Sequence, residues 1–190
     1  MRMMAVALLA VSAAQPQSPP EELEPDTRAS AIQMRPFPPF PPGTIAEGRQ
    51  DLVIADVAVD DKGRVTGVRV LRGSPEFAKA VADSVAKWRY KPATRDGRAV
   101  GDTAPLIIPF VWGRRADGVD TASAWSEVLR AALRDENEEV RIRTIGYVGS
   151  VPMPLQKEEA SALLQTALQD QSVTVQRLAQ IHLKQIEGKK

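Results

Sequence analysis

The 190-residue sequence contains no cysteine and a single histidine, His182. The absence of cysteine excludes disulfide bonds, thiolate nucleophiles and cysteine-based zinc sites, and one histidine excludes histidine clusters. Charge of one sign is not in excess either, because 25 lysines and arginines nearly balance 24 aspartates and glutamates and leave a net charge of +1. A chain this balanced lacks the basic excess that nucleic-acid binding usually needs, so we expect no nucleic-acid partner.

Sequence motifs of common enzymes are also missing. The chain has no G-x-x-x-x-G-K, no G-x-G-x-x-G after a strand, no H-E-x-x-H and no G-x-S-x-G. Its paired carboxylates lie in a predicted turn and at predicted helix starts, where acids stabilise the helix dipole or stay solvated; they are Asp60-Asp61, Glu138-Glu139 and Glu158-Glu159. We therefore expect no enzymatic activity, no cofactor and no metal.

No hydrophobic run is long enough for an ordinary membrane-spanning helix. Arg2 precedes an apolar run from Met3 to Val11, and small residues follow at positions 12–14. This is the layout of a signal peptide, whereas a membrane-spanning helix needs about 20 apolar residues. We expect residues 1–14 to be a cleaved signal peptide; an uncleaved membrane anchor and a chance hydrophobic start are the alternatives.

Residues 15–42 carry nine of the fifteen prolines, including the run PFPPFPP at residues 36–42. Such a composition favours extended, partly polyproline II conformations, so we expect a flexible spacer here. Ordinary disorder and a proline-rich ligand for a partner protein are the alternatives.

The next stretch predicts a β-hairpin. Apolar residues alternate along residues 52–59 and recur at Val65, Val68 and Val70. Between them, the residues Asp60 to Gly63 supply the backbone freedom that a turn requires. The two strands are therefore expected to pair antiparallel.

A helix is predicted to follow, with Ser74 as its N-cap and Pro75 at its first position. The apolar residues of this helix recur at spacings of four, four and three, which places them on one helical face; they are Phe77, Val81, Val85 and Trp88. Aromatics interleaved with cations around Trp88 could also form a nucleic-acid surface. The helical spacing favours Trp88 and Tyr90 as packing residues, with Lys87 and Arg89 pointing to solvent. A last strand is expected from Leu106 to Trp112.

In order and spacing, these features resemble the C-terminal domain of the TonB energy transducers. The resemblance rests on the turn DDKGRV (60–65), the strand VRVLRGS (68–74), the helix end KWRYKPATRDGRAV (87–100) and the closing strand IIPF (107–110). It implies a periplasmic α+β domain over residues 43–113: a small antiparallel three-stranded sheet with one packed helix.

Members of this family bind a short extended segment of outer-membrane receptors by adding it as a strand to the sheet edge. Strand addition is physically sound, because an edge strand offers unpaired backbone groups. The resemblance assigns this partner-binding edge to Leu106, Ile107, Ile108, Phe110 and Val111. Pro109 removes one donor, so its nitrogen has to face away from the sheet, which leaves Ile107 and Val111 to donate outward.

The C-terminal third predicts helices with an internal repeat. Leu129, Leu133, Asp135, Val140 and Val148 recur 35 residues later as Leu164, Leu168, Asp170, Val175 and Leu183. The two copies resemble HEAT repeats, which implies an all-α unit of two repeats over residues 124–188. This unit either docks on the sheet domain or presents a spare face to a partner. His182, within the last helix, is interpreted as a partly packed side chain.

We thus expect a periplasmic protein-interaction module of the TonB C-terminal type that binds an extended peptide or protein partner, with a link to outer-membrane transport. One alternative is a TonB-type energy transducer held in the inner membrane by an uncleaved N-terminus. Another is a scaffold in which the HEAT-like repeats bind the partner and the sheet domain is a support.

Overall fold

The computed structural model describes residues 27–34, 36–112, 121–150 and 155–188. The expected signal peptide and the first part of the expected spacer lie outside the described residues. The elements are, in chain order, β1 (Thr27–Arg28), β2 (Ala31–Met34), β3 (Asp51–Val59), β4 (Val65–Arg72), α1 (Pro75–Val85), β5 (Arg89–Lys91), β6 (Ala93–Arg95), β7 (Arg98–Val100), β8 (Asp102–Phe110), α2 (Thr121–Leu133), α3 (Glu138–Ser150), α4 (Lys157–Ala167) and α5 (Val173–Gly188).

A three-stranded antiparallel sheet in the order β4-β3-β8 forms the centre of the molecule. The predicted turn at residues 60–63 joins β3 to β4. Strand β3 is central, and almost every one of its residues is buried, whichever face the side chain points to. Side chains of both parities can be buried only where both faces of the sheet are covered.

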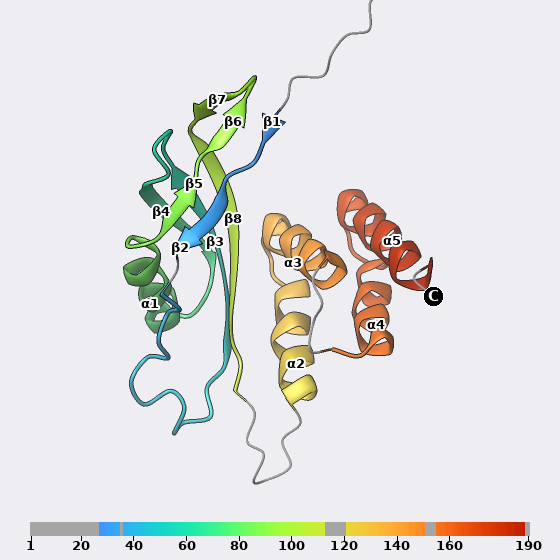
Figure 1. Cartoon of the computed structure of the whole chain (residues 1–190). Coiled ribbons are helices and arrows are strands. Elements are labelled where there is room, and N and C mark those ends of the chain that lie inside the picture. Colours follow the sequence, from blue (N-terminus) through green and yellow to red (C-terminus); the bar gives the residue numbers. More distant parts are fainter. Residues whose placement is uncertain (1–26, 35, 113–120, 151–154, 189–190) are drawn as a thin grey trace, which may run out of the picture.

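Helix α1 covers one face of this sheet (Figure 1). It begins at Pro75, as predicted, and Phe77, Val81 and Val85 pack with the buried side chains of β8 in one hydrophobic core. The helix ends at Val85, earlier than the spacing predicted, so Trp88 follows the helix instead of belonging to it. Trp88 is nevertheless fully buried, and Lys87 and Arg89 are exposed, as predicted.

The four C-terminal helices cover the opposite face of the sheet (Figure 1). Leu52 and Ile54 of β3 belong to the same buried cluster as the inner residues of α2 to α5, so the helices and the sheet share one core. The helices form two pairs, with Asp135 and Asp170 between the members of each pair. The predicted fold class, an α+β sheet domain followed by an all-α unit, is confirmed; the HEAT-like character of the helices stays a prediction.

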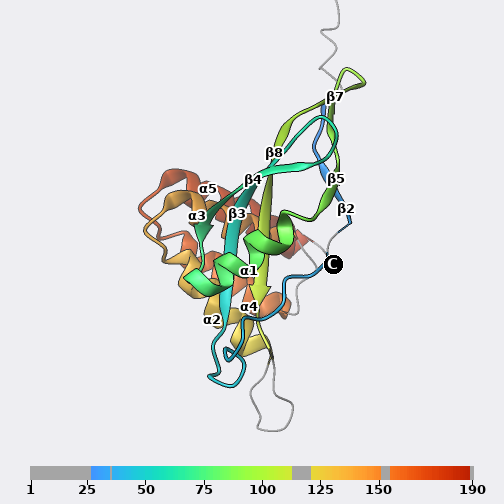
Figure 2. The same ribbon diagram turned by 90° about the vertical axis from the view of Figure 1, so that its left-hand side faces the viewer.

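The structure contains short strands that the sequence did not predict. Residues 89–95 form β5 and β6, and the Asp96-Gly97 turn connects β6 to β7 in a tight hairpin, with positive φ at both turn residues. The N-terminal strands β1 and β2 lie alongside, paired with β6 and β5 respectively. The β6–β7 hairpin extends one end of the sheet domain, away from α1 (Figure 2), whereas β5 begins only four residues after the end of α1.

The proline-rich segment contacts the sheet domain through residues 36–41. The Phe40 ring lies edge-on to Phe77 and Phe110, with centroids 6.4 and 5.2 Å away. The indole nitrogen of Trp88 donates a hydrogen bond of 3.0 Å to the carbonyl of Pro36. These contacts attach the last part of the expected spacer to the core, and they give the buried indole its polar partner.

Candidate functional site: the free edge of the sheet

Strand β8 is the edge strand that could receive a partner. Within the part of the chain that the structure describes, it pairs with β3 alone, from Val59↔Asp102 to Asp51↔Phe110. The strand starts four residues earlier than the sequence predicted, at Asp102, and ends at Phe110. All of the predicted edge residues except Val111 therefore lie in this strand, and Val111 follows it directly.

The side chains of β8 point into two different cores. Leu106, Ile108 and Phe110 are buried against α1, whereas Ile107 and Val111 pack against the cluster formed with the C-terminal helices. The side chains that were predicted to form the binding edge thus mainly hold the strand in place. What β8 offers at its open side is its backbone.

Two prolines decide which backbone groups the open side offers. Pro105 and Pro109 lie opposite Asp56 and Leu52. They are two residues before and after Ile107, so the backbone groups of all three residues point to the same side of the strand. A proline cannot donate to a ladder, and in an antiparallel pair alternate residues direct both backbone groups to the same side. The ladder to β3 is consistent with proline nitrogens that face outward. The Thr103 amide already donates a 2.7 Å hydrogen bond to Asp102 Oδ1, which leaves Ile107 as the open outward donor within β8. The open edge is therefore rich in carbonyl acceptors and poor in donors.

The N-terminal segment flanks the first half of β8. Ser30 donates two hydrogen bonds to the Asp102 carboxylate, from its amide at 3.0 Å and its hydroxyl at 2.8 Å. These bonds lower the pKa of Asp102 below its ordinary value. An open groove of about 660 Å³ lies between this segment and residues 102–105, with Ile32 and Tyr90 among its lining residues.

A set of ion pairs joins the C-terminal helices to the central strand. Asp56 of β3 is almost fully buried, and the Arg143 guanidinium of α3 lies 2.6 Å from its Oδ1 atom, outside hydrogen-bond alignment. Arg69 of β4 donates a 2.5 Å hydrogen bond to the other Asp56 oxygen and also contacts Glu139 of α3 at 3.4 Å. These contacts place charged groups of both units around one buried carboxylate.

A second ionic contact repeats a pattern found between the helix pairs. Arg72 of β4 lies 3.5 Å from the Asp135 carboxylate, just as Arg141 of α3 binds the Asp170 carboxylate at 2.7 and 3.0 Å. In each case an arginine from the preceding unit contacts the aspartate that follows the first helix of a pair. The two interfaces thus share one kind of ionic contact, an arginine of the preceding unit with the aspartate between two helices.

Asp51, at the start of β3, ties the sheet to the beginning of α1. Burial opposes ionisation of its carboxylate, but hydrogen bonds from the amides of Ser74 (2.6 Å) and Leu52 (2.8 Å), with the nearby Arg72, outweigh burial and lower its pKa. The sequence contained no local signal for this contact or for the Ser30–Asp102 contact, because the partners lie 23 and 72 residues apart.

No group of histidines, cysteines, aspartates or glutamates among the described residues could hold a metal ion. None of the helices in the described ranges has the length and apolar character to cross a membrane.

The comparisons with known proteins point to the sheet domain. Residues 36–112 match the family model described as the Gram-negative bacterial TonB protein C-terminal. Among solved structures, the chain is similar to the TonB C-terminal domain of Pseudomonas aeruginosa, determined by solution NMR, at 25% identity and a TM-score of 0.39. That similarity covers 45% of this chain and 89% of the other. A comparison with curated proteins finds no match. The family match supports the resemblance over residues 36–112 and leaves α2 to α5 outside it.

Proposed function

We propose that the sheet domain binds an extended segment of a protein partner, which adds as a strand to the open edge of β8. The single observation that carries this proposal is the position of β8, a nine-residue edge strand whose only strand partner in the described chain is β3. Such a strand presents a row of unpaired backbone groups, for which an added strand supplies main-chain hydrogen bonds.

The match of residues 36–112 to the TonB C-terminal family gives the partner its class. This family is a non-enzymatic transducer family, and its C-terminal domains are periplasmic. The match implies a partner-binding role in TonB-dependent outer-membrane transport. We accordingly propose a periplasmic location and a segment of an outer-membrane receptor as the added strand.

The donor-poor edge predicts how the partner strand is bound. Because Pro105 and Pro109 supply carbonyls but no amides, most bonds at the edge have to be donated by the partner strand. A partner segment that contains proline at the facing positions would be rejected. The side chains of the partner would alternate between the α1 side and the side of the C-terminal helices, so both units could contribute to specificity.

A photo-crosslinking amino acid at Thr103 of β8 tests the location of the site. Thr103 is exposed, so the replacement leaves the core intact. Periplasmic cross-linking followed by mass spectrometry is expected to join position 103 to an extended segment of an outer-membrane receptor. The same amino acid at Lys79 on α1, also exposed, serves as the control and is expected to give no such product. A receptor product from the same amino acid at exposed Glu158 of α4 or Glu187 of α5, and not from position 103, would instead favour the scaffold function.

The captured segment, made as a synthetic peptide, then permits a gain-of-binding test with Pro105→Ala. This exposed position would acquire one outward amide. One net hydrogen bond contributes about 0.5–1.5 kcal/mol, so affinity is expected to rise about twofold to tenfold. Stability is expected to fall slightly, because alanine frees the unfolded chain. An unchanged or weaker affinity, measured by calorimetry, would contradict strand addition at this edge. Thr103→Ala, which changes no backbone donor, is the matched control.

A further inference from the structure

The groove between the N-terminal segment and the first half of β8 combines apolar surface with one acidic group. Ile32 and Gln33 line it from β2, Tyr90 lines it from β5, and residues 102–105 line it from β8. Ile32 is 38% exposed, although it is a large apolar residue. Asp102 supplies a carboxylate to the same groove. We call this space the Asp102 groove.

Hydrogen bonds from neighbouring residues hold the Asp102 carboxylate in place. Its Oδ2 atom accepts from the amide and the hydroxyl of Ser30, and its Oδ1 atom accepts from the Thr103 amide at 2.7 Å. Such bonds favour the ionised form of a carboxylate. Among the side chains that the structure describes, no lysine or arginine forms an ion pair with Asp102. The groove thus presents a fixed negative charge to solvent.

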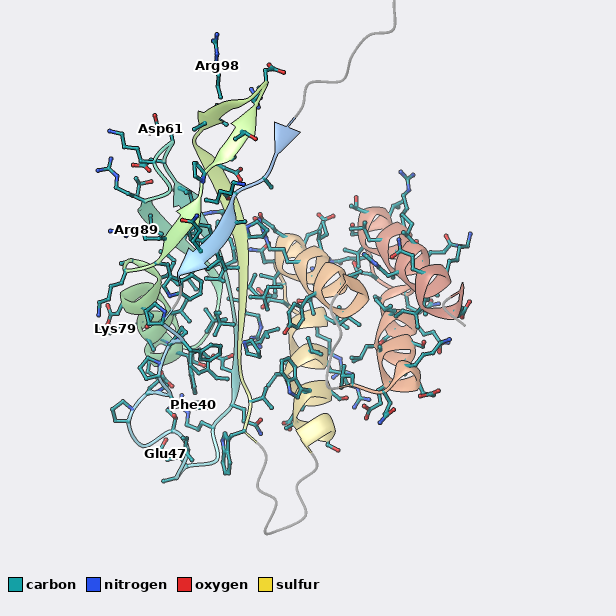
Figure 3. All side chains as sticks on the ribbon, in the orientation of Figure 1. Phe40, Glu47, Asp61, Lys79, Arg89 and Arg98 are labelled. Atoms are coloured by element: carbon teal, nitrogen blue, oxygen red, sulfur yellow. The ribbon has the colours of Figure 1, made fainter. Side chains whose placement is uncertain are left out.

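Basic residues close to the groove in sequence are directed elsewhere. Arg89 and Lys91 flank the buried Tyr90 in β5, and both are exposed. Because side chains alternate along a strand, these two point to the face opposite Tyr90. Arg98 projects from the far end of the β6–β7 hairpin, away from the sheet (Figure 3). These residues leave the Asp102 carboxylate open to a cation from another molecule.

A small residue of β8 leaves room for a long side chain at the groove. The buried residues on the α1 side of β8 are Ala104, Leu106, Ile108 and Phe110, and Tyr90 belongs to the same core. Ala104 is the smallest of them, and it lines the groove. Directly opposite residues of two paired strands point to the same face. In an added strand, the residue opposite Ala104 therefore points to the side on which Tyr90 lies.

We propose that the Asp102 groove binds a basic side chain, a lysine or an arginine, of the added strand at the position opposite Ala104. The alkyl part of this side chain lies on Ile32, and its cationic end group donates a charge-assisted hydrogen bond to Asp102. The groove thereby selects receptor segments that carry a basic residue at this position. The position within the segment rests on the proposed function, whereas the preference of the groove for a cation does not.

Three blocked pentapeptides of the sequence threonine-valine-X-valine-threonine test this preference, with lysine, norleucine or glutamate as X. Norleucine keeps the alkyl chain of lysine and removes its charge. NMR titration of the full chain follows the amides of Ile32 and Gln33 for the groove and the amide of Ile107 for strand addition. The lysine peptide is expected to bind about fivefold more tightly than the norleucine peptide, which is the upper range for an ion pair that stays partly exposed. The glutamate peptide should bind most weakly.

Asp102→Asn supplies the matched variant. Asparagine keeps a side-chain oxygen that accepts from Ser30 but carries no charge. This variant is expected to bind the lysine and norleucine peptides equally. Glu187→Gln, at an exposed position of α5, removes the same charge far along the chain and should retain the fivefold preference. The net charge of the whole chain is only +1, so overall attraction does not favour the lysine peptide.

The failures of the two proposals give different results. Equal affinity of the wild type for the lysine and norleucine peptides, with shifts at Ile107, would overturn the cation site and leave strand addition intact. If no peptide shifts the Ile107 amide, strand addition fails instead. The groove is then tested with acetyl-lysine methylamide and its norleucine counterpart, followed at Ile32 and Gln33. A preference for the lysine compound supports the cation site, and equal shifts would overturn it.

Discussion

Gly63, in the turn between β3 and β4, provides a direct test of how that turn contacts the rest of the sheet domain. Its φ angle is +75°, and a Cβ atom added there would lie 1.9 Å from the Tyr90 carbonyl oxygen. The backbones of Gly63 and Tyr90 are in direct contact, since the Tyr90 amide donates a 2.9 Å hydrogen bond to the Gly63 carbonyl. Gly63→Ala therefore has to push β5 away from the turn.

The expected cost has two parts, which a second glycine separates. Alanine at a left-handed position costs about 1–2 kcal/mol. Displacing β5 adds the loss of one hydrogen bond, about 0.5–1.5 kcal/mol, and the loosened packing of buried Tyr90. Gly63→Ala is thus expected to lower the free energy of unfolding by about 3 kcal/mol. Gly97 has φ +72° but no atom within 4 Å of an added Cβ, so Gly97→Ala should cost about 1 kcal/mol.

Urea denaturation followed by circular dichroism measures both variants, with the m-value checked for constancy. The two substitutions should differ by about 2 kcal/mol in the unfolding free energy that they remove. This difference measures only the effect of the close approach between the turn and β5. Equal destabilisation by the two substitutions would refute the backbone contact. Hydrogen exchange at the Tyr90 amide should also accelerate in Gly63→Ala and not in Gly97→Ala.

Two further predictions concern the buried carboxylates. Arg143→Met removes the α3 guanidinium from Asp56, so that the Asp56 carboxylate keeps only the more exposed Arg69 as a partner. The free energy of unfolding, measured by urea denaturation, should therefore fall by about 2 kcal/mol. Glu158→Gln, an exposed change on α4, should show none. The Asp51 carboxylate has a pKa lowered from its ordinary value of 3.8. Its contribution is therefore complete above about pH 4 and is lost as pH falls through the folded-state pKa. The stability difference between wild type and Asp51→Asn should accordingly shrink between pH 5 and pH 2 in urea titrations, and a difference independent of pH would contradict the hydrogen bonds from Ser74 and Leu52.

Much of the sheet domain could be predicted because its signals are local. The alternation around Val57, the turn at residues 60–63 and the helix start at Pro75 each lie within a few residues, and the structure confirms all three. The edge position of β8 came from the family resemblance. Its length was underestimated, because Pro105 is a poor strand residue unless its nitrogen faces outward, and only pairing with β3 reveals that.

Other features depend on contacts between distant residues and have no local signature. The spacing of apolar residues placed Trp88 on the helix, yet α1 ends at Val85. The indole is buried in the core of α1 and β8, and its nitrogen donates to the Pro36 carbonyl of the proline-rich segment. Strand β2 was not predicted, because Ala31–Met34 has no alternating pattern and is held by its pairing with β5. Docking of the helices on the sheet was one of two open alternatives, and the shared core around Leu52 shows that they dock. Whether a helix face also binds a partner stays a prediction.

The sequence by itself determined the kinds of element and most of their order, since hydrophobic period, capping and turn chemistry act over a few residues. Tertiary structure decided which backbone groups of β8 remain open, and which segments lie beside them. That outcome depends on register, on the outward orientation of two prolines and on carboxylates such as Asp56 and Asp102 that meet partners far along the chain. Such pairings are selected by the free energy of the whole packed molecule, which no short stretch of residues contains.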